Sequence, residues 1–209
     1  MGKKRPFLPR GKKRAENLGA FSARKIAPPI IFKMVVYLGV KISVIKNRRS
    51  FLQLDTRELM SHINLLIGEH AYILTNHPFN MKEEDAWKHT RAAEIAAGDK
   101  MVVIAQDGKC VAGICEVKRG KGKERYNMNF SMSVDERYRG HGLGKAMVKR
   151  AIAEGKKAWK PHKIFLFYEE GNAPARQLYE SLGFHETVRL KGYIYHYGKF
   201  IDRIMMEIK

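Results

Sequence analysis

One stretch, Ser133–Gly144, limits what this 209-residue chain can fold into more than any other. An apolar, strand-like run ends at Val134, and a helix-forming run begins at Leu143. Between and within them, glycine recurs at alternate positions: Gly140, Gly142 and Gly144. Glycine lets the backbone bend sharply and approach a ligand closely, so a turn of this kind leaves several N–H groups pointing outward. The stretch therefore predicts a strand, a tight turn and a helix whose first amides are accessible.

Such a turn suits the binding of a diphosphate. The N-terminus of a helix carries partial positive charge, and Arg139 and Lys145 add full charges beside it. Two other phosphate-binding patterns do not fit. The run lacks the Gly-Lys-Ser/Thr ending of a P-loop, and a dinucleotide-binding fold places its glycines after the first strand, not in the middle of a sheet. An ordinary glycine-rich turn is the alternative.

A second informative stretch is Asn172–Phe184, which follows a predicted strand, Ile164–Tyr168. Asn172 is a good helix cap, and a proline is harmless in the first turn that follows. An apolar stripe then runs along the helix and a glycine ends it: Ala175, Leu178, Leu182 and Gly183. The stretch predicts a short amphipathic helix over Ala173–Leu182.

Together the two stretches resemble a known family. Arg139–Gly144 matches the signature Arg/Gln-x-x-Gly-x-Gly/Ala, and Val134–Tyr138 looks like the usual lead-in. Asn172–Phe184 matches the later motif Asn-x-x-Ala-x-x-Leu-Tyr-x-x-x-Gly-Phe. Both motifs are those of the GCN5-related N-acetyltransferases (GNAT), in the same order and with a strand between. The resemblance covers roughly Asp55–Lys209 in its order of elements.

The resemblance implies an enzyme that moves an acetyl group from acetyl-CoA to a primary amine by direct attack in a ternary complex. Main-chain groups of Met132, Ser133 and Val134 would bind the pantetheine arm. Tyr179 would also contact the coenzyme, and Asn172 would contact either the coenzyme or the substrate amide. The diphosphate would lie on the loop and first helical turn: Arg139, Gly140, His141, Gly142, Leu143, Gly144 and Lys145.

The resemblance makes Tyr179 the acid that protonates the departing thiolate, although a tyrosine on an amphipathic helix can also serve packing alone. The base is less constrained. Relatives often carry a glutamate at the position of Asn129, which cannot accept a proton as a base, so we assign the role to Glu116 on the adjacent strand. Glu169, Glu170 and ordered water remain alternatives. Four histidines lack metal-ligand spacing, so no metal is implied: His62, His70, His77 and His89.

Periodicity and turn signals predict an α/β fold whose mixed, mostly antiparallel central sheet is flanked by helices. The first helix is expected to follow a cap at Asp55 or Thr56 and to end at Gly68. The other helices are expected at Lys82–Ala97, Leu143–Gly155 and Ala173–Leu182, the first of these three on the surface. One or two strands are expected within Ile30–Leu54. The other strands are expected at Met101–Ala105, Cys110–Val117, Tyr126–Val134, Ile164–Tyr168, Phe184–Tyr193 and Phe200–Ile208.

Charge divides the chain into two parts. The formal net charge is +19, and the first 49 residues hold 14 Lys and Arg against Glu16 alone. We therefore expect a basic arm at 1–29, followed by an acetyltransferase domain at 30–209. Lys3-Lys4-Arg5 and Lys12-Lys13-Arg14 suit contact with RNA or the ribosome, whereas the alternative is a solvated basic tail.

The sequence indicates the cellular location of the protein more clearly than it indicates the acceptor amine. Lys33 and Lys41 interrupt the apolar run at 30–45, so no membrane span is expected, and two cysteines placed on opposite faces of one strand fit a reduced cytoplasm. The oligomeric state is open, with a homodimer as one option.

The acceptor is a protein Nα or lysine, or else a small amine such as an amino acid, polyamine or aminoglycoside. A regulatory nucleic-acid-binding protein on a degenerate fold is the third alternative. The resemblance places the acceptor between 66–80 and 191–199. These segments are aromatic, and three tyrosines alternate as on one strand face: Tyr193, Tyr195 and Tyr197.

Overall fold

The computed structural model describes residues 39–208, so the predicted basic arm at 1–29 lies outside the described residues. The first elements are β1 (Val40–Ile45), α2 (Arg48–Leu52), α3 (Thr56–Gly68), α4 (Met81–Ala96), β2 (Lys100–Asp107) and β3 (Cys110–Arg119). A 3₁₀ turn (Gly122–Glu124), β4 (Asn127–Val134), a second 3₁₀ turn (Glu136–Tyr138) and α5 (Leu143–Trp159) follow. The last elements are β5 (Lys163–Glu169), α6 (Ala173–Glu180), β6 (His185–His196) and β7 (Lys199–Ile208).

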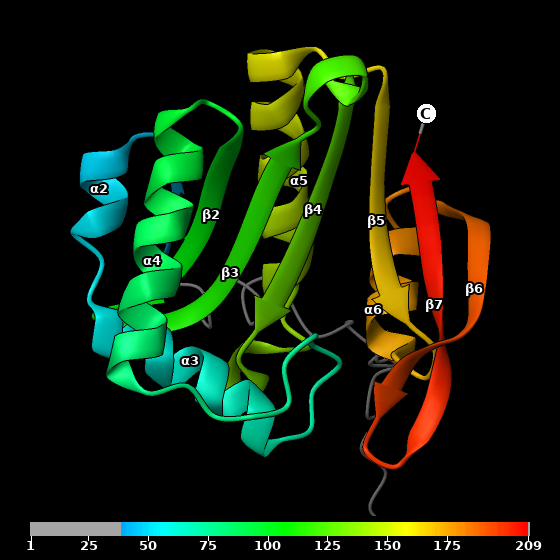
Figure 1. The fold of residues 1–209 in the computed structure, drawn as a ribbon, viewed down its shortest axis with the longest axis horizontal. Helices are drawn as coiled ribbons and strands as arrows, with labels where there is room; N and C mark the ends of the chain where they lie inside the picture. The colour runs from blue at the N-terminus through cyan, green and yellow to red at the C-terminus, as the bar shows by residue number, and fades with distance from the viewer. Residues whose placement is uncertain (1–38, 209) are drawn as a thin grey trace, which may run out of the picture.

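The strands form one seven-stranded sheet in the order β1-β2-β3-β4-β5-β7-β6. Among the pairs described, β4 and β5 are parallel and the other pairs are antiparallel. Figure 1 shows α3 and α4 in front of β2 and β3, with α5 and α6 behind the sheet. The predicted α/β fold with a mixed, mostly antiparallel sheet is confirmed. No helix within 39–208 is long and apolar enough to cross a membrane.

Two apolar cores join the helices to the sheet. The larger lies on the α5 side, where α5 contributes a stripe at helical spacing: Leu143, Met147, Val148 and Ala151. The smaller lies beneath α2, α3 and α4 and includes Phe51, Leu59 and Ile95. Because alternate residues of a strand point to opposite faces, β2 and β3 supply side chains to both cores.

The pairing of β4 with β5 stops halfway along both strands. The register runs from Asn127 opposite Lys163 to Phe130 opposite Leu166, and no further. Beyond it, within the described chain, 131–134 pair only with β3 and 167–169 only with β7. In Figure 1 the two strands diverge from this point. One edge of the carboxyl-terminal half of β4 is therefore left without a strand partner.

Two features of the first third of the chain add to the predictions. One or two strands were expected within Ile30–Leu54, and the described part of that range holds β1. It also holds the helix Arg48–Leu52, capped by the Asn47 side chain, which accepts from Ser50 N at 2.8 Å, and anchored by the buried Phe51. The second helix, α4, was expected on the surface. Most of its residues are exposed, and it buries four side chains, two of them charged: Glu84, Lys88, Ala92 and Ile95.

A glycine of α5, Gly155, lets the helix approach the sheet closely. A Cβ added to Gly155 would lie 2.1 Å from the sulfur of the buried Met128. We expect Gly155→Ala to lower the free energy of unfolding by about 1–3 kcal/mol, because overpacking outweighs the helix propensity that alanine gains.

The matched control is Gly68→Ala in α3, where nothing lies within 4 Å of the added Cβ. It should be neutral or stabilising by up to about 1 kcal/mol. Urea denaturation of both variants measures the difference. If the two variants were equally stable, α5 and β4 would not be tightly packed at Gly155 and Met128.

Candidate functional site

The glycine turn forms the open N-terminus of α5. Gly140 and Gly142 have φ angles of 78° and 86°, a left-handed backbone that glycine adopts without strain. Gly142 is the N-cap and offers no side chain to the helix, whose first described bond runs from Ala146 N to Gly142 O at 3.1 Å. The amides of 143–145 therefore have no acceptor among the described residues. Three N–H groups and the helix dipole converge on one site suited to an anion.

The two cations predicted for this turn lie in different environments. Arg139 folds back onto its own strand, where its Nε donates to Val134 O at 2.8 Å and its guanidinium forms an ion pair with Glu69. Arg139 therefore holds the turn against the end of β4. Lys145 lies in the first turn of α5. Direct contact of either side chain, or of His141, with a diphosphate stays a prediction.

The unpaired edge of β4 runs directly into this turn. Asp135 N donates to Ala112 O on β3, while Tyr126 O accepts from Lys163 N on β5. Because main-chain groups alternate in direction along a strand, those of Met132 and Val134 face the gap. Those of Ser133 face β3. The predicted main-chain contacts of Met132 and Val134 thus have suitable geometry, whereas that of Ser133 does not.

The Ser133 side chain makes a different contact, which the sequence did not reveal. Its hydroxyl lies 2.8 Å from His62 Nε2, and His62 Nδ1 lies 3.1 Å from Val111 O. Since a carbonyl oxygen can only accept, Nδ1 carries the proton and Nε2 accepts from Ser133. Burial is the main cause that lowers the pKa of His62. A neutral histidine therefore fastens α3 to β4.

Tyr179 lies where β4 and β5 separate. Its ring packs against Phe130 and Phe184 with centroid distances of 6.1 Å, and Phe130 is the last residue of β4 that pairs with β5. Only 5% of the tyrosine is exposed. Burial raises the pKa of its phenol, and nearby Cys115 and Glu169 raise it further. A phenol held protonated in this place is suited to donate a proton, so its acid role stays a prediction with geometric support.

The helix that carries Tyr179 is fixed by its cap. Asn172 Oδ1 accepts from Ala175 N at 3.2 Å, and a proline occupies the first turn. The side chain of Asn172 therefore serves the helix directly. Its predicted contact with a coenzyme stays a prediction.

Glu116, the base assigned from the sequence, is held by two cations. Its Oε1 lies 2.8 Å from Arg91 Nε and 3.1 Å from Lys100 Nζ. It is opposite Ser131 in the β3–β4 register, so β4 stands between it and the gap. Glu84, one of the buried residues of α4, has its pKa raised to about 7, first by burial and then by the charge of Glu116. The role of Glu116 as a base stays a prediction.

On the other side of the gap, stacked rings join two segments that are far apart in sequence. His70 stacks on Tyr197 at 4.0 Å, and Tyr72 stacks on His196 at 4.7 Å. These contacts tie the α3–α4 loop to the tip of the β6–β7 hairpin. The two segments expected to border the acceptor therefore do meet.

Of the three alternating tyrosines, two lie on β6 and the third lies beyond the end of that strand. Tyr193 and Tyr195 are each 60% exposed on β6. Tyr197 has a φ of 42° and forms the hairpin turn with Gly198, which ends the strand alternation. Its ring therefore leaves the strand and lies on His70.

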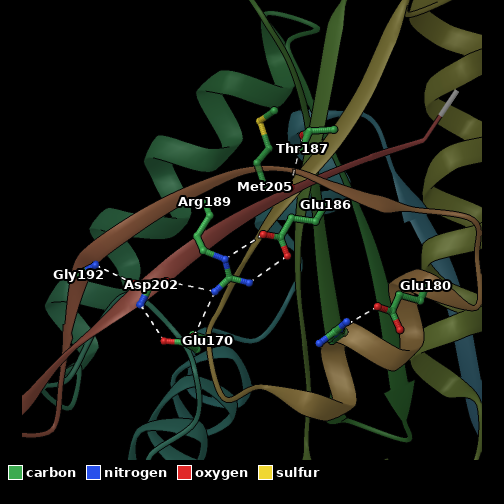
Figure 2. A network of polar contacts seen from close by, with 9 residues as sticks. Glu170, Glu180, Glu186, Thr187, Arg189, Gly192, Asp202 and Met205 are labelled. Carbon is green, nitrogen blue, oxygen red and sulfur yellow. Dashed lines mark hydrogen bonds and ion pairs between the residues drawn. The ribbon is translucent and has the colours of Figure 1, made fainter.

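A polar network at the base of the same hairpin holds it to the end of β5 (Figure 2). Arg189 lies within 3.2 Å of both Glu170 and Asp202 and also contacts Glu186. Asp202 Oδ1 accepts from Gly192 N at 2.9 Å, beside the irregular pairing between 190 and 194. The network holds the irregular part of the hairpin to the residue that follows β5.

Comparison with known proteins agrees with this geometry. L-methionine sulfoximine/L-methionine sulfone acetyltransferase of Salmonella typhimurium is 29% identical over 110 residues, which are 52% of this chain and 64% of that protein. The chain thus spans less than two thirds of this relative. An N-alpha-acetyltransferase of Sulfurisphaera tokodaii is 26% identical over 118 residues, which are 56% of this chain and 71% of that protein.

Solved structures share the fold. The protein yncA of Salmonella typhimurium, solved with its cofactor acetyl-CoA, has a TM-score of 0.66 at 21% identity and covers 82% of this chain and 94% of its own. A ribosomal-protein-alanine N-acetyltransferase of Brucella melitensis also has a TM-score of 0.66 at 21% identity, covering 80% and 98%. The model of the acetyltransferase (GNAT) family matches residues 65–184, more than half of the chain. This chain is a member of the GNAT acetyltransferase family.

Proposed function

We propose that this protein transfers an acetyl group from acetyl-CoA to a primary amine by direct attack in a ternary complex. One observation carries the proposal: the open amides at the start of α5 lie next to the main-chain groups on the unpaired edge of β4. The open amides at 143–145 adjoin the unpaired edge at Met132 and Val134. A diphosphate joined to an amide-containing arm matches that arrangement, and a structure of this fold was solved with acetyl-CoA.

In this proposal the diphosphate accepts hydrogen bonds from the amides of Leu143, Gly144 and Lys145. The pantetheine amides bond to the edge of β4 as a neighbouring strand would. The thioester then lies near Phe130, where the gap begins and where Tyr179 is anchored.

Acetyl transfer removes two protons from the acceptor nitrogen and delivers one proton to the sulfur. The acceptor ammonium loses one proton, and its nitrogen then attacks the thioester carbon, forming a C–N bond while the C–S bond breaks. The sulfur takes a proton from Tyr179, and the nitrogen releases its second proton, so one proton returns to solvent. The protein mainly positions the reactants and supplies these proton transfers.

The acceptor in this proposal is a protein Nα or lysine amine. Two proteins that share sequence or fold with this chain are named for protein Nα or ribosomal-protein alanine acetylation. The alternative is a small amine, supported by the relative named for methionine sulfoximine and by a spermine/spermidine N(1)-acetyltransferase of Bacillus subtilis. Contact of 1–29 with RNA or the ribosome also stays a prediction, tested by filter binding with and without that segment at several salt concentrations.

The diphosphate site can be tested by pairing two glycines of the same backbone conformation. Gly140 and Gly98 have φ angles of 78° and 74°, and nothing lies within 4 Å of a Cβ added to either. Alanine should strain each by about 1–2 kcal/mol. Gly140→Ala should also weaken acetyl-CoA binding about tenfold, because 1.4 kcal/mol of lost amide alignment corresponds to that factor.

Calorimetry with acetyl-CoA and with CoA measures the two variants against the wild-type protein. Gly98→Ala, at the far end of α4, should leave both affinities unchanged. A folded wild-type protein that binds neither compound would overturn the proposed function itself.

The acid role is tested by Tyr179→Phe. Loss of the hydroxyl should lower kcat by about 10²-fold or more, within the usual range for general acids, while acetyl-CoA affinity changes little. Tyr168→Phe is the matched control, since Tyr168 is also 5% exposed and belongs to the same core. Release of CoA from acetyl-CoA is the measurement. Unchanged turnover of the Tyr179 variant would remove this residue from the mechanism.

A further inference from the structure

Glu169 is a buried carboxylate on the strand that borders the gap. It is the last residue of β5 and only 7% exposed. Phe165 and Phe167 contact each other, with ring centroids 5.8 Å apart, on one face of this strand, while Tyr168 belongs to the α5-side core. Since side chains alternate, Glu169 continues the face of the two phenylalanines. It therefore lies on the face of the sheet opposite α6, next to the stretch where β5 has no β4 partner.

We propose that Glu169 is the base that takes the proton from the acceptor ammonium, on the side of the gap opposite Tyr179. The proposal deepens the proposed function and rests on it. Acceptor and acetyl-CoA would then reach the reaction centre from opposite faces of the sheet. Glu169, on one face, would take a proton from the ammonium, and Tyr179, on the other, would give a proton to the sulfur.

The side chain of Glu169 has two polar contacts among the described residues, a hydrogen bond with its own main chain and a long ion pair with Arg203. Arg203, its register partner on β7, places Nε 3.8 Å from Oε1, beyond hydrogen-bonding distance. Arg203 Nε is buried and has no hydrogen-bond partner among the described residues. Its guanidinium lies 4.7 Å from the Phe167 ring centroid. The Arg203 guanidinium therefore packs on the Phe167 ring and lies near the Glu169 carboxylate without a hydrogen bond from Nε to Oε1.

The electrostatic surroundings suit a base. Burial raises the pKa of Glu169, and Arg203 partly offsets that rise. The charge of Glu169 in turn raises the pKa of Tyr179, so the two groups influence each other across the gap. A raised carboxyl pKa brings the group nearer to the operating pH, where a base is most effective.

The neighbouring carboxylates are less suitable. Glu170, the next residue, belongs to the Arg189 network of Figure 2 and points into the base of the hairpin. Glu116 is held by Arg91 and Lys100, with β4 between it and the gap. Among these carboxylates, Glu169 is the buried one that borders the gap, and its ion pair with Arg203 is long, at 3.8 Å.

The approach to Glu169 is also enclosed by the acceptor-side loop. Gly171, two residues on, has a φ of 91°, and a Cβ there would lie 2.5 Å from the Tyr72 hydroxyl. Tyr72 is the ring that stacks on His196 of the hairpin. An amine that passes this ring pair meets the end of β5, where Glu169 lies.

The proton balance is simple. The Glu169 carboxylate accepts one proton from the ammonium, directly or through one water, before the nitrogen attacks. Tyr179 gives its proton to the sulfur as the C–S bond breaks, and the second nitrogen proton replaces it. Glu169 then releases its proton to solvent, which accounts for the one proton produced in each turnover.

The test compares pH profiles of kcat/KM for the full-length wild-type protein, Glu169→Gln, Glu169→Asp and Arg203→Met. The assay is CoA release with an acceptor amine that the wild-type protein acetylates. Glu169→Gln should lower kcat by about 10²-fold or more and lose the acidic limb, while calorimetric acetyl-CoA affinity is retained. Glu169→Asp should restore part of the rate together with the limb.

Arg203→Met separates a base from a structural carboxylate. The charge of Arg203 lowers the pKa of Glu169, so its removal should move the acidic limb to higher pH. Glu180→Gln, an exposed carboxylate paired with Arg176 on α6, is the control and should leave the profile unchanged. If the wild-type protein turns over and Glu169→Gln keeps its rate and limb, the inference fails. If the wild-type protein neither binds nor uses acetyl-CoA, the proposed function fails instead.

Discussion

The site depends on where β4 stops pairing with β5. An unpaired main-chain edge inside a sheet is costly, because its N–H and C=O groups need partners. Met132 and Val134 present such groups immediately after the Phe130–Leu166 pair. One of these groups already has a partner in the protein, because Arg139 Nε donates to Val134 O. The remaining main-chain groups of this edge are arranged so that an amide-containing ligand could pair with them as a strand would.

The packing around this point explains why the strands separate there. Tyr179, Phe130 and Phe184 meet edge to face at the apex, so α6 is wedged behind the diverging strands. On the other side of the turn, α5 approaches β4 closely at Gly155 and Met128. The helix that offers its amides is thus fixed to the same strand that offers its edge, and the two halves of the proposed coenzyme site keep their spacing.

Sequence reasoning succeeded where structure is locally determined. The glycine turn, the Asn172 cap and the regular helices α3 and α5 carry their signals within a few residues. It failed where tertiary contacts decide. Arg48–Leu52 is a helix whose Phe51 packs into the smaller core. In α4, the buried Lys88 donates to Leu54 O and Thr56 Oγ1, and its charge partly offsets the rise that burial causes in the pKa of the buried Glu84. The contact between His62 and Ser133, 71 positions apart in the chain, has no local signal at all.

Glu169 and Glu170 show why residue type alone could not assign the base. They are adjacent and chemically identical, but strand alternation and the turn that follows place them in different surroundings. Glu170 is half exposed and neutralised by Arg189, whereas Glu169 is buried beside an arginine that its phenylalanine neighbour holds slightly too far away. A cation at hydrogen-bonding distance would fix the negative form, and no cation would favour the neutral one. The intermediate distance lets a carboxylate change protonation within a reaction cycle, and that distance is set by the β5–β7 register.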